Sequence, residues 1–363
     1  MPVGRELNKP PTIHDLAADL KISATTVWRA LHGHARVNAK TKERVLDRAK
    51  AINYVPSLVA QNLSHGHTRT LGFIVPMIAH PVFSALIEVV EEIAFSRGYA
   101  VILCDARLDV ALEAEYARML RRRRVEGVLV VPFSKQPHQW DTHLIELQKN
   151  DVPVVLLEQG LPSNRFDKVV ADNFGAAYAM TQHLIQLGHE RIAFAFHPLN
   201  ERDMVGGERL AGFKKAMEDA GFSGKSQVLL DACEFGERDT LRYHREKVAE
   251  CFSRPERPTA LFAGMDMLAI LAMKTLQELG LEIPRDVVVA GFDNIDVSPL
   301  TNPPLTTVMQ PTEEMSRLAI EILFDRIEGT ADRRKEATCK RLPCQLVIRE
   351  SCGASLSRLP QVA

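Results

Sequence analysis

The segment from Ser23 to Leu31 carries side chains whose types and spacing could contact a nucleic acid. In a helix that begins after Ser23, Val27 and Leu31 turn inward because they are four residues apart. The outward face then carries the side chains of Ala24, Thr25, Trp28 and Arg29. A guanidinium such as that of Arg29 can form two hydrogen bonds to a guanine edge in the major groove of DNA.

Two short helices joined by a tight turn must position this face. The first is marked by apolar residues at helical spacing, namely Ile13, Leu16, Ala17 and Leu20. Residues 19–22 suffice only for a turn, and Ser23 stands at an N-cap position. A helix-turn-helix braces one such helix on the DNA backbone and offers the N-terminal side chains of the other to the major groove. On these residues alone, an ordinary pair of core helices remains the alternative.

A third helix and a short segment follow this pair of helices. Asn38 is a suitable N-cap for a helix over 39–52, whose apolar face consists of Val45, Leu46, Ala49 and Ile52. The segment 55–66 contains a proline near its start and closes with a glycine. It would form about two helical turns, which are marginal in water without support. We therefore expect this segment to become ordered only when a partner holds it.

The charge of the chain is divided unevenly. Residues 1–68 hold ten Lys and Arg against five Asp and Glu, a net charge of +5. The whole chain carries −1, so the remainder carries −6. A small basic head on an acidic body indicates a polyanionic partner that only the head contacts.

The length and composition of the chain indicate a soluble protein of two or three domains. The chain has 363 residues, of which 46% are hydrophobic, and no apolar run is as long as a membrane span or resembles a signal core. Its six cysteines contain no CxxC pair, which argues against a zinc site and against a disulfide framework. No GxSxG, Walker A or HExxH motif occurs. We therefore expect no catalytic residue, no cofactor and no metal ion, and a cytoplasmic location.

From Thr70 onward, apolar strand-like runs alternate with amphipathic helical patterns. The strands are expected near 71–75, 100–103, 127–131, 153–157, 169–171, 191–196, 228–230, 259–263, 287–291 and 345–348. The helices are expected near 83–97, 110–123, 139–149, 174–187, 206–220, 239–252, 266–279 and 312–328. Such alternation predicts parallel sheets covered by helices on both faces. About ten strands are too many for one compact sheet, so we expect two doubly wound subdomains.

These segments, taken in order, resemble the lac repressor/gal repressor (LacI/GalR) family of transcription regulators. The matching pieces are ISATTV (22–27), TKERVL (41–46), YVP (54–56), VAQNL (59–63), TLGFIVP (70–76), GHERIA (188–193), RLAGF (209–213), GFD (291–293) and PLTTV (304–308). The resemblance implies an α/β fold with an N-terminal all-α helix-turn-helix head and a two-lobed, doubly wound parallel-sheet core of the periplasmic-binding-protein type.

The resemblance also implies domain boundaries. The head would span 12–54, a hinge helix and linker 55–68, and an effector-binding core 69–350. Lobe one would comprise about 69–171 and 311–328. Lobe two would comprise about 172–310 and 340–350, with a ligand cleft at the carboxyl ends of the strands.

By position, several residues match the DNA contacts of the family. Ala24, Thr25 and Arg29 would read bases, whereas Ser23 and Thr26 would bond phosphates. The resemblance adds further DNA contacts at Asn38, Tyr54, Ala60 and Leu63, and Leu63 matches a leucine that wedges into the minor groove. Two residues depart from the family: Trp28 replaces a usual serine, and Lys21 stands where glycine is common, so the operator sequence does not follow by analogy.

The effector cleft is likewise assigned by resemblance. Arg209 matches a ligand-binding arginine of the family, and Asp293, at a strand end, matches its ligand-binding carboxylate. Glu158, also at a strand end, stands where the family often has aspartate. The other residues assigned to the cleft are His80, Phe83, Phe235 and Met265. Met265 departs from a usual asparagine, which would remove an amide able to bind a hydroxyl group.

We therefore expect a sequence-specific, ligand-responsive DNA-binding repressor. It would act as a cytoplasmic, nucleoid-associated homodimer on a palindromic operator of double-stranded DNA, with a small-molecule effector such as a sugar or sugar acid. A solute-binding receptor, or a sugar or nucleotide enzyme on the same core fold, is the alternative. The arginines 121–124 look like a nucleic-acid patch, but we expect them to end a helix whose dipole they complement.

Overall fold

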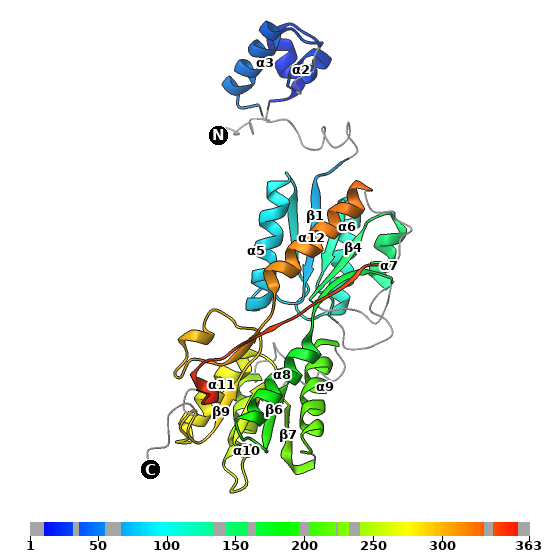
Figure 1. Cartoon of the computed structure of the whole chain (residues 1–363). Coiled ribbons are helices and arrows are strands. Elements are labelled where there is room, and N and C mark those ends of the chain that lie inside the picture. The colour runs from blue at the N-terminus through cyan, green and yellow to red at the C-terminus, as the bar shows by residue number, and fades with distance from the viewer. Residues whose placement is uncertain are drawn as a thin grey trace, which may run out of the picture. The chain divides into compact units, whose positions relative to one another are not determined.

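The computed structural model divides the chain into two compact units, Met1–Thr68 and Arg69–Ala363 (Figure 1). We call the first unit the head and the second the core. The structure describes residues 11–31, 36–54, 67–133, 142–158, 165–196, 204–222, 224–231, 240–329 and 337–354. The predicted hinge segment 55–66 lies outside these residues.

The head consists of three helices around a small apolar core. These are α1 (Ile13–Leu20), α2 (Ala24–Leu31) and α3 (Ala39–Ala51). The side chains that meet in their centre are fully buried, namely Leu16, Val27, Ala30 and Val45. The prediction of three helices is confirmed. Leu31, predicted to point inward, is half-buried against this core.

Local capping explains where the head helices begin. Thr12 and Asp15 form a reciprocal capping box at α1. The Ser23 hydroxyl accepts a hydrogen bond from the backbone N–H of Thr26 at 3.1 Å, as an N-cap of α2 does. The Asn38 side chain accepts one from the N–H of Thr41 at 2.8 Å at the start of α3. Lys21 ends α1 with φ 53° and ψ 43°, the left-handed conformation that explains why glycine suits this position.

Lobe one of the core is built on a six-stranded parallel sheet. The strand order is β11-β5-β4-β3-β1-β2. The strands are β1 (Thr70–Val75), β2 (Ala100–Asp105), β3 (Gly127–Val130), β4 (Val154–Glu158), β5 (Asp167–Ala171) and β11 (Cys339–Leu342). Helices α5 (Pro81–Ser96) and α12 (Thr312–Glu328) share one apolar cluster with the sheet, while α6 (Val110–Arg122) and α7 (Thr142–Lys149) share another.

Lobe two is built on a second parallel sheet, in the order β7-β6-β8-β9. Its strands are β6 (Ile192–Phe196), β7 (Gln227–Asp231), β8 (Ala260–Ala263) and β9 (Val288–Ala290). Helices α8 (Asn173–Gln186) and α9 (Met204–Asp219) share one apolar cluster with this sheet, and α10 (Thr240–Phe252) and α11 (Asp266–Glu278) share the other. Short 3-10 helices complete the lobe: η2 (Gly224–Ser226), η3 (Ser298–Leu300) and η4 (Glu350–Cys352). The predicted α/β fold with two doubly wound lobes is confirmed.

Strands β10 (Thr307–Met309) and β11 were not predicted, whereas β12 (Gln345–Val347) corresponds to the strand predicted at 345–348, and β11 changes the assignment of the C-terminal segment. β10 pairs antiparallel with β12. β11 pairs with β5 in the sheet of lobe one, although the sequence assigns residues from 340 onward to lobe two. The chain therefore returns to lobe two only after Leu342. Because β11 is an exposed edge strand of sequence Cys-Lys-Arg-Leu, it lacks the apolar run that marks a central strand.

Candidate functional site

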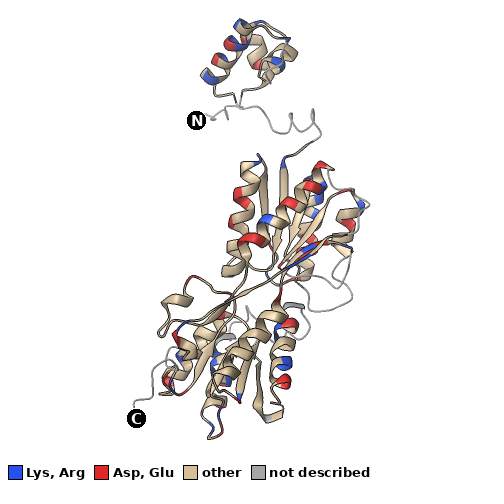
Figure 2. Cartoon of the chain, in the orientation of Figure 1, with Lys and Arg blue, Asp and Glu red and all other residues tan. Residues whose placement is uncertain are grey.

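The predicted DNA-reading side chains lie together at the start of α2. Thr25 is exposed, and Ala24, Trp28 and Arg29 are half-buried. The hydroxyls of Ser23 and Thr26 lie 2.8 Å apart and hydrogen-bond to each other. Lys and Arg outnumber Asp and Glu by six to four in the described helices of the head, and Figure 2 marks the basic residues in blue and the acidic ones in red.

The remaining predicted DNA contacts have varied surroundings. Asn38 is exposed, with its side-chain oxygen used to cap α3. Tyr54 packs beside the head core, and burial raises its pKa. Ala60 and Leu63 lie outside the described residues.

Arg209 is the centre of the predicted cleft in the core. Its Nε donates to Oδ1 of Asn173 at 2.8 Å, and its Nη1 donates to the carbonyl of Gly264 at 2.6 Å. The same Nη1 lies 3.5 Å from Oδ1 of Asp293, and Nη2 lies 4.0 Å from Oε1 of Glu158. The three charged side chains that the sequence assigned to the cleft therefore converge, although they come from β4, α9 and the loop after β9.

These charges are held in a dry environment. Arg209, Glu158 and Asp293 are each less than 10% exposed. The guanidinium carbon of Arg209 also lies 3.7 Å from the centre of the Phe292 ring, which adds a cation–π contact. Electrostatic interactions are strengthened where water is excluded.

Asp293 stands in an unusual backbone conformation that its neighbours hold in place. Its φ is 119° and that of Asn294 is 54°, values that residues other than glycine rarely adopt. The Asp293 carboxylate accepts a hydrogen bond from Nε2 of Gln310 at 2.8 Å. Arg349 donates to the Asn294 side chain at 2.6 Å and so pins the same turn.

A second buried carboxylate, that of Asp266, supports this turn. It accepts hydrogen bonds from the backbone N–H of Ile295 at 3.0 Å and from the hydroxyls of Ser298 at 2.6 Å and Thr307 at 2.5 Å. Burial raises the pKa of Asp266, and the negative charge of Asp293 raises it further. Burial also raises the pKa of Asp293, while Arg209 opposes that rise. The two acids therefore hold on to protons more strongly than free aspartic acids do.

His80 and Phe83 approach the cleft from the N-terminus of α5. Their rings lie 4.8 Å apart. Burial, with the charge of Arg209 as the second cause, lowers the pKa of His80 to about 4, so its imidazole is neutral at pH 7. Phe83 is buried in the core of lobe one. Met265 precedes α11 and is half-buried against the core of lobe two, whereas Phe235 lies outside the described residues.

Sequence reasoning missed several residues that surround Arg209. These are Asn173, Phe292, Gln310 and the backbone carbonyl of Gly264. Asn173 and Gln310 stand at two of the lobe boundaries that the resemblance implies, 171/172 and 310/311, and this was the available signal. A backbone carbonyl leaves no signal in side-chain types.

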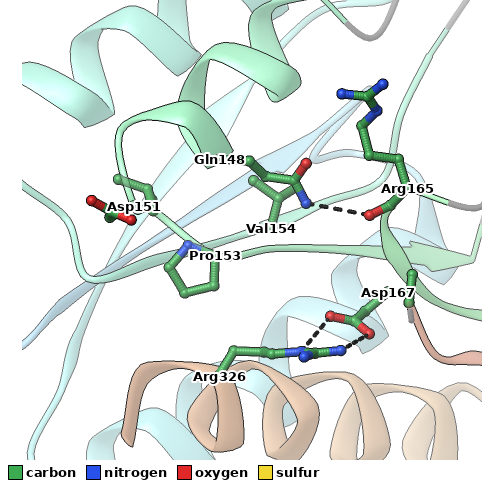
Figure 3. Close-up of a pocket in the computed structure, with 9 residues that line it drawn as sticks. Gln148, Asp151, Pro153, Val154, Arg165, Asp167 and Arg326 are labelled. Atoms are coloured by element: carbon green, nitrogen blue, oxygen red, sulfur yellow. Dashed lines mark hydrogen bonds and ion pairs between the residues drawn. The ribbon is translucent and has the colours of Figure 1, made fainter. Parts of the chain in front are cut away.

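Cavities lie at two places in the described part of the core. One of about 480 Å³ is lined by Asp293, Gln310 and the start of α12. The other, of about 340 Å³, lies at the amino ends of β4 and β5, where Arg326 makes a two-point ion pair with Asp167 (Figure 3). Of the predicted effector residues, Asp293 lines the first cavity, whereas Arg209 and Glu158 are not among its lining residues. This cavity can accommodate a small polar molecule between carboxylates and an amide.

Two further observations concern metal binding and membrane spanning. Within the described ranges, no cluster of three or more His, Cys, Asp or Glu side chains is arranged to hold a metal ion. None of the helices in the described part of the chain combines the length and apolar character that crossing a membrane requires.

Comparisons with known proteins give separate family matches for the head and for the core. Residues 12–57 match the family described as bacterial regulatory proteins, lacI family, and residues 181–352 match a periplasmic binding protein-like domain. The HTH-type transcriptional repressor PurR of Photobacterium profundum is 34% identical over 345 residues, which cover 94% of this chain and 98% of that protein. The PurR of Proteus mirabilis is also 34% identical, over 94% of this chain and 96% of that protein.

Solved structures show the same architecture. A LacI family transcriptional regulator from Enterococcus faecium with bound ribose is 30% identical, with a TM-score of 0.67, and covers 78% of this chain and 98% of its own. The lac repressor dimer bound to operator and an anti-inducer has a TM-score of 0.81 at 24% identity, over 95% of this chain and 99% of its own. From the full-length identity to PurR repressors, the capped helix-turn-helix head and the two-lobed core, we conclude that this chain belongs to the lacI family of bacterial transcription regulators and is a DNA-binding regulator.

Proposed function

We propose that this chain is a homodimeric repressor whose operator affinity is controlled by a small, hydroxyl-rich metabolite bound between the two core lobes. The observation that carries the proposal is the position of Arg209 between Glu158 of lobe one and Asp293 of lobe two. A ligand that bonds to both carboxylates and to the guanidinium would bind differently when the lobes move apart. Such differential binding is what allows an effector to change affinity at a distant site.

The side chains of the cleft indicate the chemistry of the ligand. Two carboxylates accept hydrogen bonds and Arg209 donates them, and the family resemblance would make the aromatic ring of Phe83 an apolar wall. The Oε1 atom of Gln310 is buried and has no hydrogen-bond partner among the described residues, so it adds an acceptor for a ligand hydroxyl. A sugar, a sugar acid or a related polyol presents this mixture of groups. The regulator from Enterococcus faecium binds ribose, and the 28% identical regulator CelR was solved with cellobiose, which supports the same ligand class here.

A homodimer is supported by large apolar side chains that are exposed on both lobes of the core. Phe95 at the end of α5 is 75% exposed, and Leu300 in η3 is 79% exposed. Val297 beside η3 and Met267 on α11 are also exposed. Helices α5 and α11 lie on the same side of the view in Figure 1. Covering these side chains by a second copy would remove apolar area from water, and a two-fold dimer would place two heads on a palindromic operator.

A selection experiment tests this function. The full-length chain is incubated with a pool of random-sequence duplexes, and the bound duplexes are recovered and sequenced. The proposal predicts a common motif with two inverted half-sites. A duplex that carries this motif is called the selected duplex below.

A second experiment searches for the effector. The thermal unfolding of the purified chain is measured with ribose, cellobiose and a panel of other sugars, sugar acids and nucleobases. A ligand at 100 times its Kd should add about 2.7 kcal/mol of stability.

The outcomes separate this function from its rivals. A solute-binding receptor or an enzyme on the same core fold would return no common motif, while still being stabilised by its ligand. A repressor should act on the chromosome, so we also place the protein in the cytoplasm with the nucleoid. Recovery of single, unpaired half-sites would contradict the homodimer and leave the family assignment intact.

A further inference from the structure

The residue at which the core begins has a strained backbone. Arg69 follows the predicted linker and immediately precedes β1, and its φ is 47°. The left-handed region is unfavourable for a residue with a side chain and persists only where the surroundings enforce it. Such an outlier is a reason to ask what the enforced conformation does.

Four contacts enforce the conformation of Arg69. Its backbone N–H donates to Oε1 of Glu126 at 2.6 Å, and its carbonyl accepts from the N–H of Ala100 at 2.9 Å. Its guanidinium donates to the carbonyl of Arg97 at 3.2 Å and lies 5.4 Å from the centre of the Tyr99 ring. Both the main chain and the side chain of this residue are therefore fixed to lobe one.

Glu126 and Tyr99 are the centre of the contacts that fix Arg69 to lobe one, which we call the Arg69 attachment. The second carboxylate oxygen of Glu126 accepts a hydrogen bond from the Tyr99 hydroxyl at 3.0 Å. Burial and the bond to Glu126 raise the pKa of Tyr99 to about 12, so the phenol stays a neutral donor at physiological pH. A carboxylate that accepts from two donors is held more firmly than one that accepts from a single donor.

Residues of the Arg69 attachment also contact helix α12. The Tyr99 ring meets the edge of Phe324 with 5.0 Å between centroids, and Arg97 lies 4.5 Å from the centre of the Phe324 ring and 4.0 Å from Glu328. Helix α12 begins two residues after Gln310, whose side chain bonds Asp293 in the cleft. A continuous set of packed groups thus joins the cleft to Arg69 through one rigid helix.

We propose that Glu126, together with Tyr99, is a positioning residue for operator binding, because it fixes the backbone of Arg69 where the linker to the head enters the core. This inference rests on the proposed function, since two copies with fixed linker entries would set the distance between two heads. Neither residue contacts DNA or effector in this role. Their effect is on how strictly the protein requires one half-site spacing.

The test compares four full-length proteins: wild type, Glu126→Ala, Tyr99→Phe and the control Glu115→Ala. Glu115 is an exposed glutamate on α6, so its removal matches the change in charge. Binding is measured on the selected duplex, on versions with the half-sites moved one base pair closer or farther apart, and on random duplex. The melting temperature of each protein is also recorded.

Wild type and Glu115→Ala should lose at least about tenfold in affinity when the spacing changes, because the two heads must fit sites a fixed distance apart. Glu126→Ala should bind the selected duplex several-fold more weakly and lose less than about threefold on changing the spacing. Tyr99→Phe keeps the ring contacts and removes one hydrogen bond, so it should show an intermediate loss. Binding to random duplex should be unchanged in all four.

Two results would overturn the proposal. One is the same spacing dependence in Glu126→Ala and in wild type. The other is an equal loss on every duplex with a lowered melting temperature, which would assign Glu126 a structural role only. Tyr99→Phe retains the buried ring, so it remains informative if Glu126→Ala folds poorly. Failure of wild type to select any duplex would contradict the proposed function instead.

Discussion

Nη2 of Arg209, on helix α9 of lobe two, lies 4.0 Å from Oε1 of Glu158, the last residue of strand β4 in lobe one. Both side chains are almost completely buried. Removing one member of a buried charge pair is costly, because the other is left without compensation. Under the proposed function, this pair would respond to a ligand that changes the separation of the lobes.

Truncation of Arg209 should make the protein insensitive to its effector. Arg209→Ala should lose about 1–3 kcal/mol or more of affinity for the panel compound that stabilises wild type, because the ligand acceptors are left unpaired. The measurement is calorimetric titration of that compound. Arg242→Ala is the control, since Arg242 is an exposed arginine that pairs with Glu246 on α10. Unchanged affinity in Arg209→Ala would place the effector elsewhere.

Arg29 should contribute to sequence reading. Arg29→Ala should cost about 1–3 kcal/mol on the selected duplex and relax the base preference at one position per half-site. Binding to random duplex should change little, because it depends mainly on phosphate contacts. Gel shifts on both duplexes measure the two effects. Equal losses on the two duplexes would show that Arg29 contacts phosphate alone.

The loop that carries Asp293 should not tolerate a methyl group at Gly291. A Cβ added there would lie 2.1 Å from Oδ1 of Asp266, whereas a Cβ added at Gly264 would find its nearest atom at 3.5 Å. Gly291→Ala should therefore destabilise the core by about 1–3 kcal/mol, as overpacking does, and Gly264→Ala should have a much smaller effect. Urea denaturation of both variants tests this difference. Equal stability would indicate that Asp266 moves at no cost.

The buried His244 should make stability depend on pH. Burial lowers its pKa to about 4, so the folded protein binds its proton less readily than the unfolded chain, whose histidine has a pKa near 6.5. Below pH 6.5 the unfolded state binds more protons, so stability falls as the pH falls from about 6.5 to 4. The loss should approach about 3 kcal/mol.

The matching measurement compares wild type with His244→Gln from pH 4 to pH 7.5. The difference in free energy of unfolding between the two proteins should grow in favour of wild type as the pH rises to 6.5, and then remain constant. A difference that does not vary with pH would mean that His244 titrates normally in the folded state.

Local signals made most of the elements predictable. The caps at Ser23 and Asn38 and the apolar runs of the central strands are read from neighbours in sequence, so the helices and parallel strands followed. β11 was missed because an edge strand need not be apolar. The left-handed Arg69 and Asp293 were not predictable, because contacts distant in sequence impose these conformations.

The cleft was predictable in part, and through resemblance more than through pattern. Glu158 ends β4 and Asp293 follows β9, so each acid lies at the carboxyl end of a strand in its own lobe, where the resemblance places the ligand cleft. Asn173 and Gln310 bond to Arg209 and Asp293 only because the chain crosses between the lobes at those points. Their residue types do not indicate such a crossing. Phe292 contributes its ring face to Arg209, a role that depends on tertiary packing and leaves no trace in spacing.

The central claim is that a ligand held by Arg209 controls binding of the head to DNA. The most direct measurement is the affinity of full-length wild type and Arg209→Ala for the selected duplex, with and without the stabilising panel compound. Wild-type affinity should change by about 5- to 150-fold, the range of a coupling free energy of 1–3 kcal/mol, while Arg209→Ala should not respond. The same change in both proteins would contradict the account, because the effector would then act without Arg209.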